Sequence, residues 1–409
     1  MNATSFTALP AILAGLLLLG FAGCRAPEEN PFRPPVEVKQ TPPALVPLTE
    51  TASSLRQWTG VAVLPGNRVI VCFPRWSDNV PVSVAELDAA GVAKPFPDAE
   101  WNRWAPGLEP KTHFVCVQSV IADSRGKLWV LDAASPKFKG IVAGGPKLIQ
   151  FDPATRAVLK TIFFDDKAAP PGSYLNDVRI DDTAGIAYLT DSGLGALLVT
   201  NLATGATRRL LENDPSTQSE GITLAVGGKD WRLPDGSCPD IHADGIALDA
   251  RGGFLYYQAL TSRSLYRIPI RDLLNPDLLN PDLAKTDPAK AILAETNLAK
   301  AIEFLGLIGA ADGLEFGPDG QLYLTALEDS AIKRFDPVTR SLTVIAQDSA
   351  RLRWPDSLAF GPDGRLYVTV SQIHLGPAPA TPYTILTLSP PPPPPAPAPV
   401  PAPVLAPGK

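Results

Sequence analysis

The chain of 409 residues is poor in the side chains that most often carry metal and redox chemistry. It has 3 histidines, 4 cysteines and 1 methionine. No cysteine or histidine pair has the spacing of a zinc site. A P-loop, a dinucleotide fingerprint and a serine nucleophile elbow are also missing from the sequence, which sets aside phosphoryl transfer and hydride transfer.

An excess of positive charge is missing as well. Lys and Arg number 36 against 42 Asp and Glu, which gives a net charge of −6. A nucleic-acid surface normally needs a basic stripe, so nucleic acid is excluded as a partner. Hydrophobic residues make up 45% and charged residues 19%. These values exclude both a disordered polyelectrolyte and a polytopic membrane protein.

The apolar stretch 11–23 is too short to cross a bilayer as a helix and is typical of a signal peptide. It ends in Phe21-Ala22-Gly23-Cys24, which resembles a bacterial lipobox. We therefore expect residues 1–23 to be a signal peptide and Cys24 to be lipidated. An ordinary signal peptide with an incidental Cys24 is the alternative. Both predict an exported protein, and the first predicts membrane contact through a lipid anchor only.

Proline is abundant, with 45 residues, about twice the usual share. Many of these prolines lie in residues 24–52, which we interpret as a Pro-rich tether, and in residues 389–409, which read as a polyproline tail. Both segments are expected to be disordered. The prolines between them lie mainly at turns, so the high count does not indicate disorder throughout.

Between these ends one phrase recurs six times: a short alternating run, a turn with Asp or Gly, and a strand rich in Leu, Tyr, Trp and Val. Each copy is typical of a β-hairpin. Further strand pairs follow several copies, which predicts four-stranded sheets and an all-β, six-bladed β-propeller over residues 53–388. A two-domain β-sandwich would not repeat the phrase six times. The copies span residues 60–73, 119–132, 177–191, 244–259, 312–326 and 356–370.

Residues 271–305 do not follow the blade pattern. This segment repeats LLNPD and continues with an Ala-, Lys- and Leu-rich run. We interpret it as an inserted loop with short helical turns.

Several phrases resemble the major royal jelly and yellow protein family. They are GNRVIVCFPRWSDNVPVSVAEL at 66–87, GKLWVLDAA at 126–134, PKLIQFDPATRAVLKTIFF at 146–164, LNDVRID at 175–181 and RWPDSLAF at 353–360. The resemblance implies a six-bladed propeller. It also implies an aromatic or amine-bearing ligand in the central channel, or dopachrome-type tautomerase activity.

The residues just before the innermost strand of each blade are expected to ring one mouth of the channel. Four blades place Asn or Asp there, and such oxygens suit either an ammonium group or calcium. Single Asp residues at these positions also cap turns without any ligand. The predicted ligand-binding residues are Trp58, Asn176, Asp177, Asp244, Asp312 and Asp356.

Three functions remain open. A tautomerase would use His242 and Asp244 as catalytic groups, with His113 and His374 as weaker candidates. A calcium-dependent lactone hydrolase of the gluconolactonase type would use Asn176 and Asp244 as metal ligands, but its first-blade Glu is replaced by Thr59. The third function is a non-catalytic interaction module. We expect a monomer whose aromatic walls come from Trp58, Trp76, Trp104 or Trp354.

Overall fold

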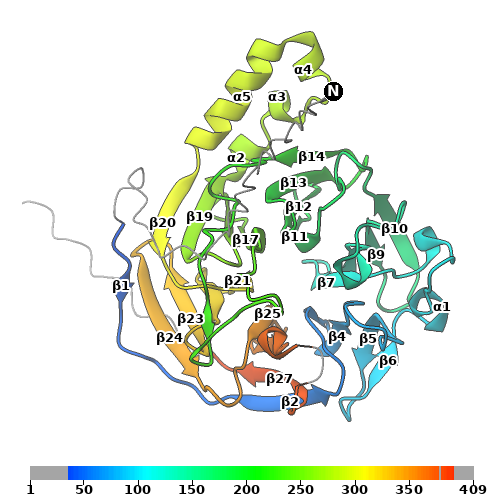
Figure 1. Ribbon diagram of the computed structural model, residues 1–409, viewed down its shortest axis with the longest axis vertical. Helices are drawn as coiled ribbons and strands as arrows, with labels where there is room; N and C mark the ends of the chain where they lie inside the picture. Colours follow the sequence, from blue (N-terminus) through cyan, green and yellow to red (C-terminus); the bar gives the residue numbers. More distant parts are fainter. Residues whose placement is uncertain (1–35, 377–378, 391–409) are drawn as a thin grey trace, which may run out of the picture.

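The computed structural model describes residues 36–376 and 379–390. Six four-stranded antiparallel units surround a central axis, with the first strand of each unit innermost (Figure 1). The prediction of an all-β, six-bladed propeller is therefore confirmed. The predicted signal peptide, Cys24 and most of the Pro-rich tail lie outside the described residues.

Each blade runs from its inner to its outer strand. Blade 1 is made of β3 (Val61–Leu64), β4 (Arg68–Cys72), β5 (Val84–Leu87) and β6 (Ala93–Pro95). Blade 2 is made of β7 (Val117–Ala122), β8 (Leu128–Asp132), β9 (Lys147–Phe151) and β10 (Val158–Phe163). Blade 3 is made of β11 (Leu175–Asp181), β12 (Ile186–Asp191), β13 (Ala196–Asn201) and β14 (Thr207–Leu210).

The other three blades follow the same order. Blade 4 is made of β17 (Ala243–Asp249), β18 (Phe254–Ala259), β19 (Ser264–Pro269) and β20 (Glu303–Leu307). Blade 5 is made of β21 (Leu314–Phe316), β22 (Leu322–Ala326), β23 (Ala331–Asp336) and β24 (Ser341–Gln347). Blade 6 is made of β25 (Pro355–Phe360), β26 (Leu366–Val370), β27 (Tyr383–Leu388) and the N-terminal β2 (Thr49–Ser54).

The N-terminal segment closes the propeller. Strand β2 pairs antiparallel with β27 and supplies the outer strand of blade 6. Strand β1 (Lys39–Gln40) adds in parallel to the outer edge of blade 5. Residues 36–52, the described part of the segment interpreted from sequence as a tether, therefore contribute to two blades. Both strands lie at exposed outer edges, so their residues show no hydrophobic alternation from which a strand could be predicted.

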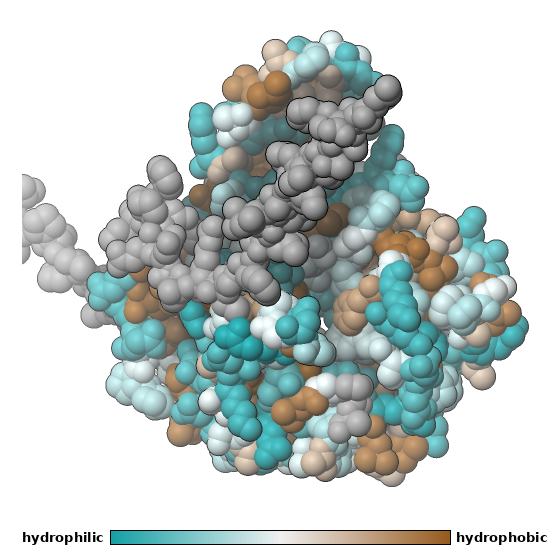
Figure 2. All heavy atoms as spheres, in the orientation of Figure 1, coloured by the Kyte–Doolittle hydropathy of each residue, from teal (hydrophilic) through white to brown (hydrophobic). Residues whose placement is uncertain are grey.

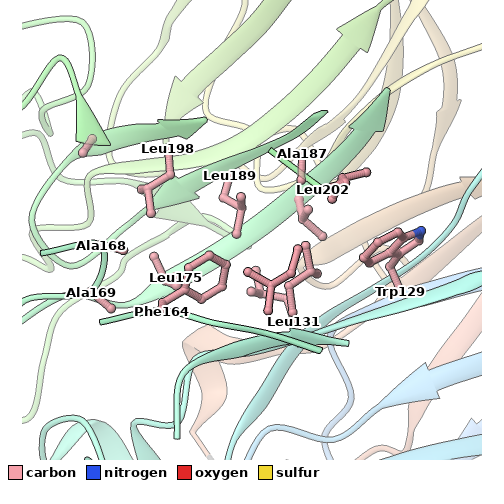
Figure 3. Packing of buried hydrophobic residues seen from close by; sticks show 14 residues of the cluster. Trp129, Leu131, Phe164, Ala168, Ala169, Leu175, Ala187, Leu189, Leu198 and Leu202 are labelled. Atoms are coloured by element: carbon pink, nitrogen blue, oxygen red, sulfur yellow. The ribbon is translucent and has the colours of Figure 1, made fainter. Parts of the chain in front are cut away.

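The hydrophobic core lies between neighbouring blades. Between blades 2 and 3, Trp129 and Leu131 pack against Leu175 and Leu189, and all four are almost fully buried (Figure 3). Burying one such side chain contributes about 1.5–3 kcal/mol. The hydrophobic residues that alternate along the predicted strands thus pack one blade against the next.

Two insertions interrupt the blade pattern. Between β19 and β20 lie α2 (Ile270–Leu273), α3 (Pro276–Leu279), α4 (Leu283–Thr286) and α5 (Pro288–Lys300), which confirms short helices in the predicted insert. Asn275 and Asp287 cap α3 and α5, each with proline at the first helical position. The apolar residues at the top of the space-filling view lie over this insert (Figure 2).

A smaller hairpin, β15 (Ala225–Val226) and β16 (Lys229–Asp230), lies between blades 3 and 4. The remaining helix α1 (Ala99–Asn102) and the 3₁₀ turns Pro110–Thr112, Pro136–Phe138 and Ile373–Leu375 lie in loops. Within residues 36–376 and 379–390, none of the helices is long and apolar enough to span a membrane.

Candidate functional site

A ring of acidic side chains lies where the inner strands of blades 3 to 6 begin. The strands β11, β17, β21 and β25 surround the centre of the molecule in Figure 1. Asp244 and Asp356 are each 4% exposed, Asp312 is 8% exposed, and Asp177 is half-buried. We call Asp177, Asp244, Asp312 and Asp356 the carboxyl ring.

One repeated hydrogen bond fixes the start of these inner strands. Thr190 of β12 accepts a bond from the Asp177 N–H at 3.1 Å and donates to the carbonyl of Asp244 in the next blade at 2.6 Å. In blade 1 the thiol of Cys72 takes the same place, accepting from Gly60 N at 3.3 Å and donating to the Gln118 carbonyl at 3.2 Å. Blade 1 is thus tied to blade 2, and blade 3 to blade 4.

Neutral donors contact three members of the ring. The Asn176 amide donates to Asp244 Oδ1, and the Trp354 indole N–H donates to Asp312 Oδ2 at 2.6 Å. The hydroxyl of Ser357 donates to Asp356 Oδ1 at 3.1 Å. These bonds bring together residues from blades 3 to 6, as the sequence predicts.

Asp356 is the least satisfied member of the ring. Its Oδ2 is buried without a hydrogen-bond partner among the described residues, and so is the hydroxyl oxygen of Ser371. The Ser371 hydroxyl lies close enough to favour the charged form of Asp356, but the two groups do not meet hydrogen-bond geometry. A buried carboxylate oxygen without a partner is costly, so a hydrogen-bond donor that reached this oxygen would stabilise the ring.

Burial and mutual repulsion make the ring hard to ionise. Removal from water raises the pKa of Asp244, Asp312 and Asp356 well above the ordinary value. Repulsion by the neighbouring carboxyls raises these pKa values further. Burial also raises the pKa of Asp177, although the nearby Arg179 opposes this change. A bound cation would therefore favour ionisation of the ring.

Below the ring, Arg179 reaches across the channel. Its guanidinium donates to the carbonyl of Leu314 on β21 and lies 3.3 Å from Glu315 Oε2. A cavity of about 120 Å³ lies here, with Asp177, Arg179 and Glu315 among its lining residues and apolar residues of blades 1, 2 and 6 opposite. Sequence reasoning missed Arg179 and Glu315, although they lie two residues beyond Asp177 and Gly313 on the same strands.

The three histidines differ in their surroundings. The His242 ring accepts a hydrogen bond at Nδ1 from the Ser219 N–H at 3.1 Å, so its neutral form carries the proton on Nε2. Among the described residues no hydrogen bond joins this ring to Asp244. His113 is buried and bonded to the Glu109 carbonyl at 2.7 Å. The His374 ring stacks on Trp354, and burial lowers its pKa to about 4.

The candidate aromatic walls fall into two groups. Trp58 is 1% exposed and its N–H bonds to the Thr384 carbonyl at 3.2 Å, so it packs blade 1 against blade 6. This position corrects the prediction of Trp58 as a ligand contact. Trp104 is likewise buried, beneath the guanidinium of Arg75.

Trp76 remains as a wall, whereas Trp354 is fully buried like Trp58. Trp76 donates to the Tyr174 hydroxyl at 2.7 Å and its ring lies 5.4 Å from that of Phe138, which is 62% exposed. Tyr174 in turn donates to Gln118 at 2.9 Å, next to Ser119, whose hydroxyl lies beside Asp177. An exposed aromatic surface is thus connected to the carboxyl ring.

The ring contains the oxygen donors that calcium prefers, but their arrangement does not fit the ion. Within the part of the chain that the structure describes, no three Asp, Glu, His or Cys side chains are grouped closely enough to hold a metal. Asn176 turns its amide N–H toward Asp244, and Thr59 donates to the Gln118 carbonyl at 2.9 Å. Calcium ligation by Asn176 and Asp244 would need these side chains to rearrange.

The fold is shared with a solved gluconolactonase from Xanthomonas campestris. The two chains are 13% identical with a TM-score of 0.51, and the match covers 88% of this chain and 99% of the gluconolactonase. At this identity the similarity supports the propeller fold alone.

Curated relatives come from the honeybee Apis mellifera. Major royal jelly protein 5 is 25% identical over 52% of this chain and 34% of its own length. Major royal jelly protein 6 is 26% identical over 49% of this chain and 46% of its own length. The matches thus span less than half of these relatives. The family model described as major royal jelly protein matches residues 115–375, well over half of the chain. This chain therefore belongs to the major royal jelly protein family.

Proposed function

We propose that this protein binds a small amine-bearing aromatic molecule at the mouth of its channel. The observation that carries the proposal is the buried, unpartnered Oδ2 of Asp356 within a ring of four carboxyls. An ammonium group supplies both the positive charge and the N–H donors that this ring lacks. A neutral or anionic ligand would leave the repulsion among the carboxyls unrelieved.

The aromatic part of the ligand has a matching surface. Phe138 exposes most of its side chain, and its ring lies 5.1 Å from that of Tyr174. Offset aromatic contacts contribute about 0.5–1.5 kcal/mol beyond the area they bury. The aromatic part of the ligand would then pack on Phe138, while its ammonium group binds the carboxyl ring.

The same site suits a dopachrome-type tautomerisation. That reaction removes a carbon-bound proton beside an activated carbonyl or iminium group and returns a proton elsewhere. A raised pKa makes a carboxyl a better proton carrier, and burial raises the pKa of Asp244 and Asp356 well above the ordinary value. His242 is less suited, because its Nδ1 already accepts the Ser219 N–H.

Isothermal titration calorimetry with dopamine tests the binding proposal. We expect saturable binding of dopamine and none of 4-ethylcatechol, which has the same ring without the ammonium group. Asp356→Asn should weaken dopamine binding at least tenfold, because one charge-assisted hydrogen bond is worth about 1.5–3 kcal/mol. Asp363→Asn, in the turn after β25, is the matched control and should bind as the wild type does. Equal binding of both compounds would contradict the proposal.

Calcium-dependent lactone hydrolysis is the second candidate. It is favoured by the acidic ring beside Asn176, which supplies oxygen donors of the kind calcium takes. If neither an amine nor calcium binds, a non-catalytic interaction module becomes the better description.

We further propose export of the chain, with Cys24 as a lipid attachment site. Its test is the loss of membrane association in Cys24→Ser.

A further inference from the structure

A groove of about 350 Å³ lies on the seam between blade 6 and blade 1, apart from the carboxyl ring. Strands β2 and β27 of blade 6 form one side, and the turns that follow β3 and β5 of blade 1 form the other. These strands are neighbours at the lower edge of the ring of blades in Figure 1. The volume lies within the range of sites that bind small ligands. The residues that shape the groove most are Thr51, Ala52, Val69, Leu87, Ala89 and Ile385.

The groove suits an uncharged, apolar occupant. Aliphatic side chains from both blades line it. Its two charged lining residues are already engaged, since Arg68 pairs with Glu86 at 2.6 Å and Asp88 accepts two N–H groups of its own turn at 3.0 and 2.9 Å. At Gly66 an added Cβ would meet nothing within 4 Å, so the groove is open on that side.

A β-bulge lies in the strand that borders the groove. Glu50 and Ala52 of β2 pair with successive residues of β27, and Thr51 between them pairs with neither. A bulge bends its strand and interrupts the ladder at that point. Strand β2 is also the outermost strand of blade 6. The groove therefore lies where the N-terminal segment completes the ring of blades.

The part of the chain that the structure describes ends beside this groove. Strand β27 runs in the same direction as the inner strand β25, and β5 runs in the same direction as β3. Leu388 and the turn after Leu87 therefore lie at the same end of the propeller. Leu388 is three residues beyond Ile385, which is about 10 Å along the strand. The residues that follow Pro390 thus start within reach of the groove.

The segment after Pro390 has the chemistry that the groove suits. Residues 391–399 read PPPPPAPAP and carry no charged side chain. A run of prolines favours the polyproline II helix, whose rise of about 3.1 Å per residue gives nine residues a length of about 28 Å. Because proline restricts the free chain, ordering such a segment costs little conformational entropy. Its carbonyls need donors, and the exposed Asn67 in the lining of the groove has a side-chain amide that can donate.

We propose that residues 391–399 occupy this groove and clasp blade 6 to blade 1. The occupant is the chain's own tail because the tail is apolar, uncharged and attached beside the groove. Attachment gives the tail an effective concentration of about 1 mM, so a contact with a Kd of about 0.1 mM is formed in about nine molecules out of ten. The contact adds a link at the seam that β2 closes. It is independent of the ligand proposed at the channel mouth.

Crosslinking within the full chain tests the contact. Ala396→Cys in the tail is combined with Ala89→Cys in the groove or with Val338→Cys, and a short bismaleimide is added. Val338 is 89% exposed in the turn between β23 and β24 of blade 5, which corresponds to the turn of Ala89 and flanks blade 6 on its other side. A tail without a preferred contact would reach both positions. We expect the pair with Ala89→Cys to crosslink at least tenfold faster.

The single variants measure any reaction with the native cysteines, of which Cys72 and Cys116 are buried. Equal crosslinking rates for the two pairs would overturn the proposal. Crosslinks that join two molecules would also overturn it, because the occupant of the groove would then be the tail of a second copy.

A peptide of residues 389–399 gives an independent test, read by fluorescence anisotropy. A full chain whose residues 391–399 are replaced by Gly and Ser should bind this peptide, and the wild type should bind it about tenfold more weakly, because its own tail occupies the groove. In the Gly and Ser chain, Ala89→Trp fills the groove and should weaken peptide binding at least tenfold. Ala90→Trp, the next residue of the same exposed turn, should not. No peptide binding to the Gly and Ser chain, or equal binding in Ala89→Trp, would contradict the proposal.

Discussion

The guanidinium of Arg179 on β11 lies 3.3 Å from Glu315 Oε2 on β21, so an ion pair between a buried Arg and a half-buried Glu links blades 3 and 5. Arg179 is 7% exposed, and its Nε has no hydrogen-bond partner among the described residues. Its Nη1 donates to the carbonyl of Val178 on its own strand, and its Nη2 donates to the carbonyl of Leu314 in blade 5. The pair therefore connects strands that make no sheet contact with each other.

Breaking this pair should be costly. We expect Arg179→Met to lower the free energy of unfolding by about 1–3 kcal/mol, because it leaves the half-buried Glu315 without its partner. The double variant Arg179→Met/Glu315→Gln should recover part of that loss. Urea denaturation measures both, and Arg365→Met, which breaks the exposed pair with Asp363, should cost at most about 1 kcal/mol. A double variant that is less stable than Arg179→Met would contradict this account.

The carboxyl ring should make stability depend on pH. Because the pKa of Asp356 in the folded protein lies above its unfolded value, its contribution is fully present below about pH 4. That contribution is lost as the pH rises through the folded pKa. The unfolding free energy of the wild type should therefore decrease between about pH 4 and pH 7. Without ligand, we expect this decrease to be smaller in Asp356→Asn, by about 1 kcal/mol or more. A steeper fall in the variant would show that the ring is ionised in the folded state.

Calcium separates the two enzyme candidates. Since the described side chains are not arranged to hold a metal, we expect millimolar calcium to leave the thermal midpoint of unfolding unchanged relative to EDTA. A rise of several degrees that disappears in Asp244→Ala or Asp312→Ala would instead favour calcium-dependent lactone hydrolysis. Magnesium serves as the control for ionic strength.

The two groups predicted from sequence to be catalytic should behave differently. His242→Gln should retain any dopachrome conversion within about threefold, because the Nδ1 of His242 is engaged with Ser219. Asp244→Asn should reduce it at least a hundredfold, as expected for loss of a general acid or base. The rate of loss of dopachrome absorbance measures both variants. A larger loss in His242→Gln would restore His242 as the base.

The N-terminal strand should be needed for a stable propeller. A chain of residues 53–388 lacks most of β2 and so exposes the edge of β27. We expect its melting temperature to lie roughly 5 °C or more below that of residues 36–390, since a few kcal/mol correspond to such a shift. Thr51→Pro in the longer chain should act in the same direction, as proline removes an N–H donor from the strand. Equal melting temperatures would show that closure does not depend on β2.

Much of the fold could be predicted from the sequence because each blade repeats its own turn and strand chemistry. The inner hairpins, such as Asp312 to Ala326, carry both the turn residues and the strand alternation in one phrase. The edge strands β1 and β2 could not be predicted, since their residues are exposed and their pairing depends on sheets formed far along the chain.

The site was predictable in part for the same reason. Asn176, Asp244 and Asp356 are each the second residue of an inner strand, so the repeat itself places them at the same level. The contacts between blades are absent from any local pattern. The bond from Trp354 to Asp312 and the reach of Arg179 to blade 5 both depend on how the closed ring brings distant strands together.

The use of Cys72 in place of a threonine between blades has a consequence for chemical labelling. Burial raises the pKa of the Cys72 thiol to about 12, and that of Cys116 likewise. At neutral pH neither thiol forms the thiolate that reacts with alkylating reagents or disulfides. Each becomes reactive only when the blades around it separate, blades 1 and 2 for Cys72 and blades 2 and 3 for Cys116, so the rate of modification at these two positions reports directly on the opening of the propeller ring.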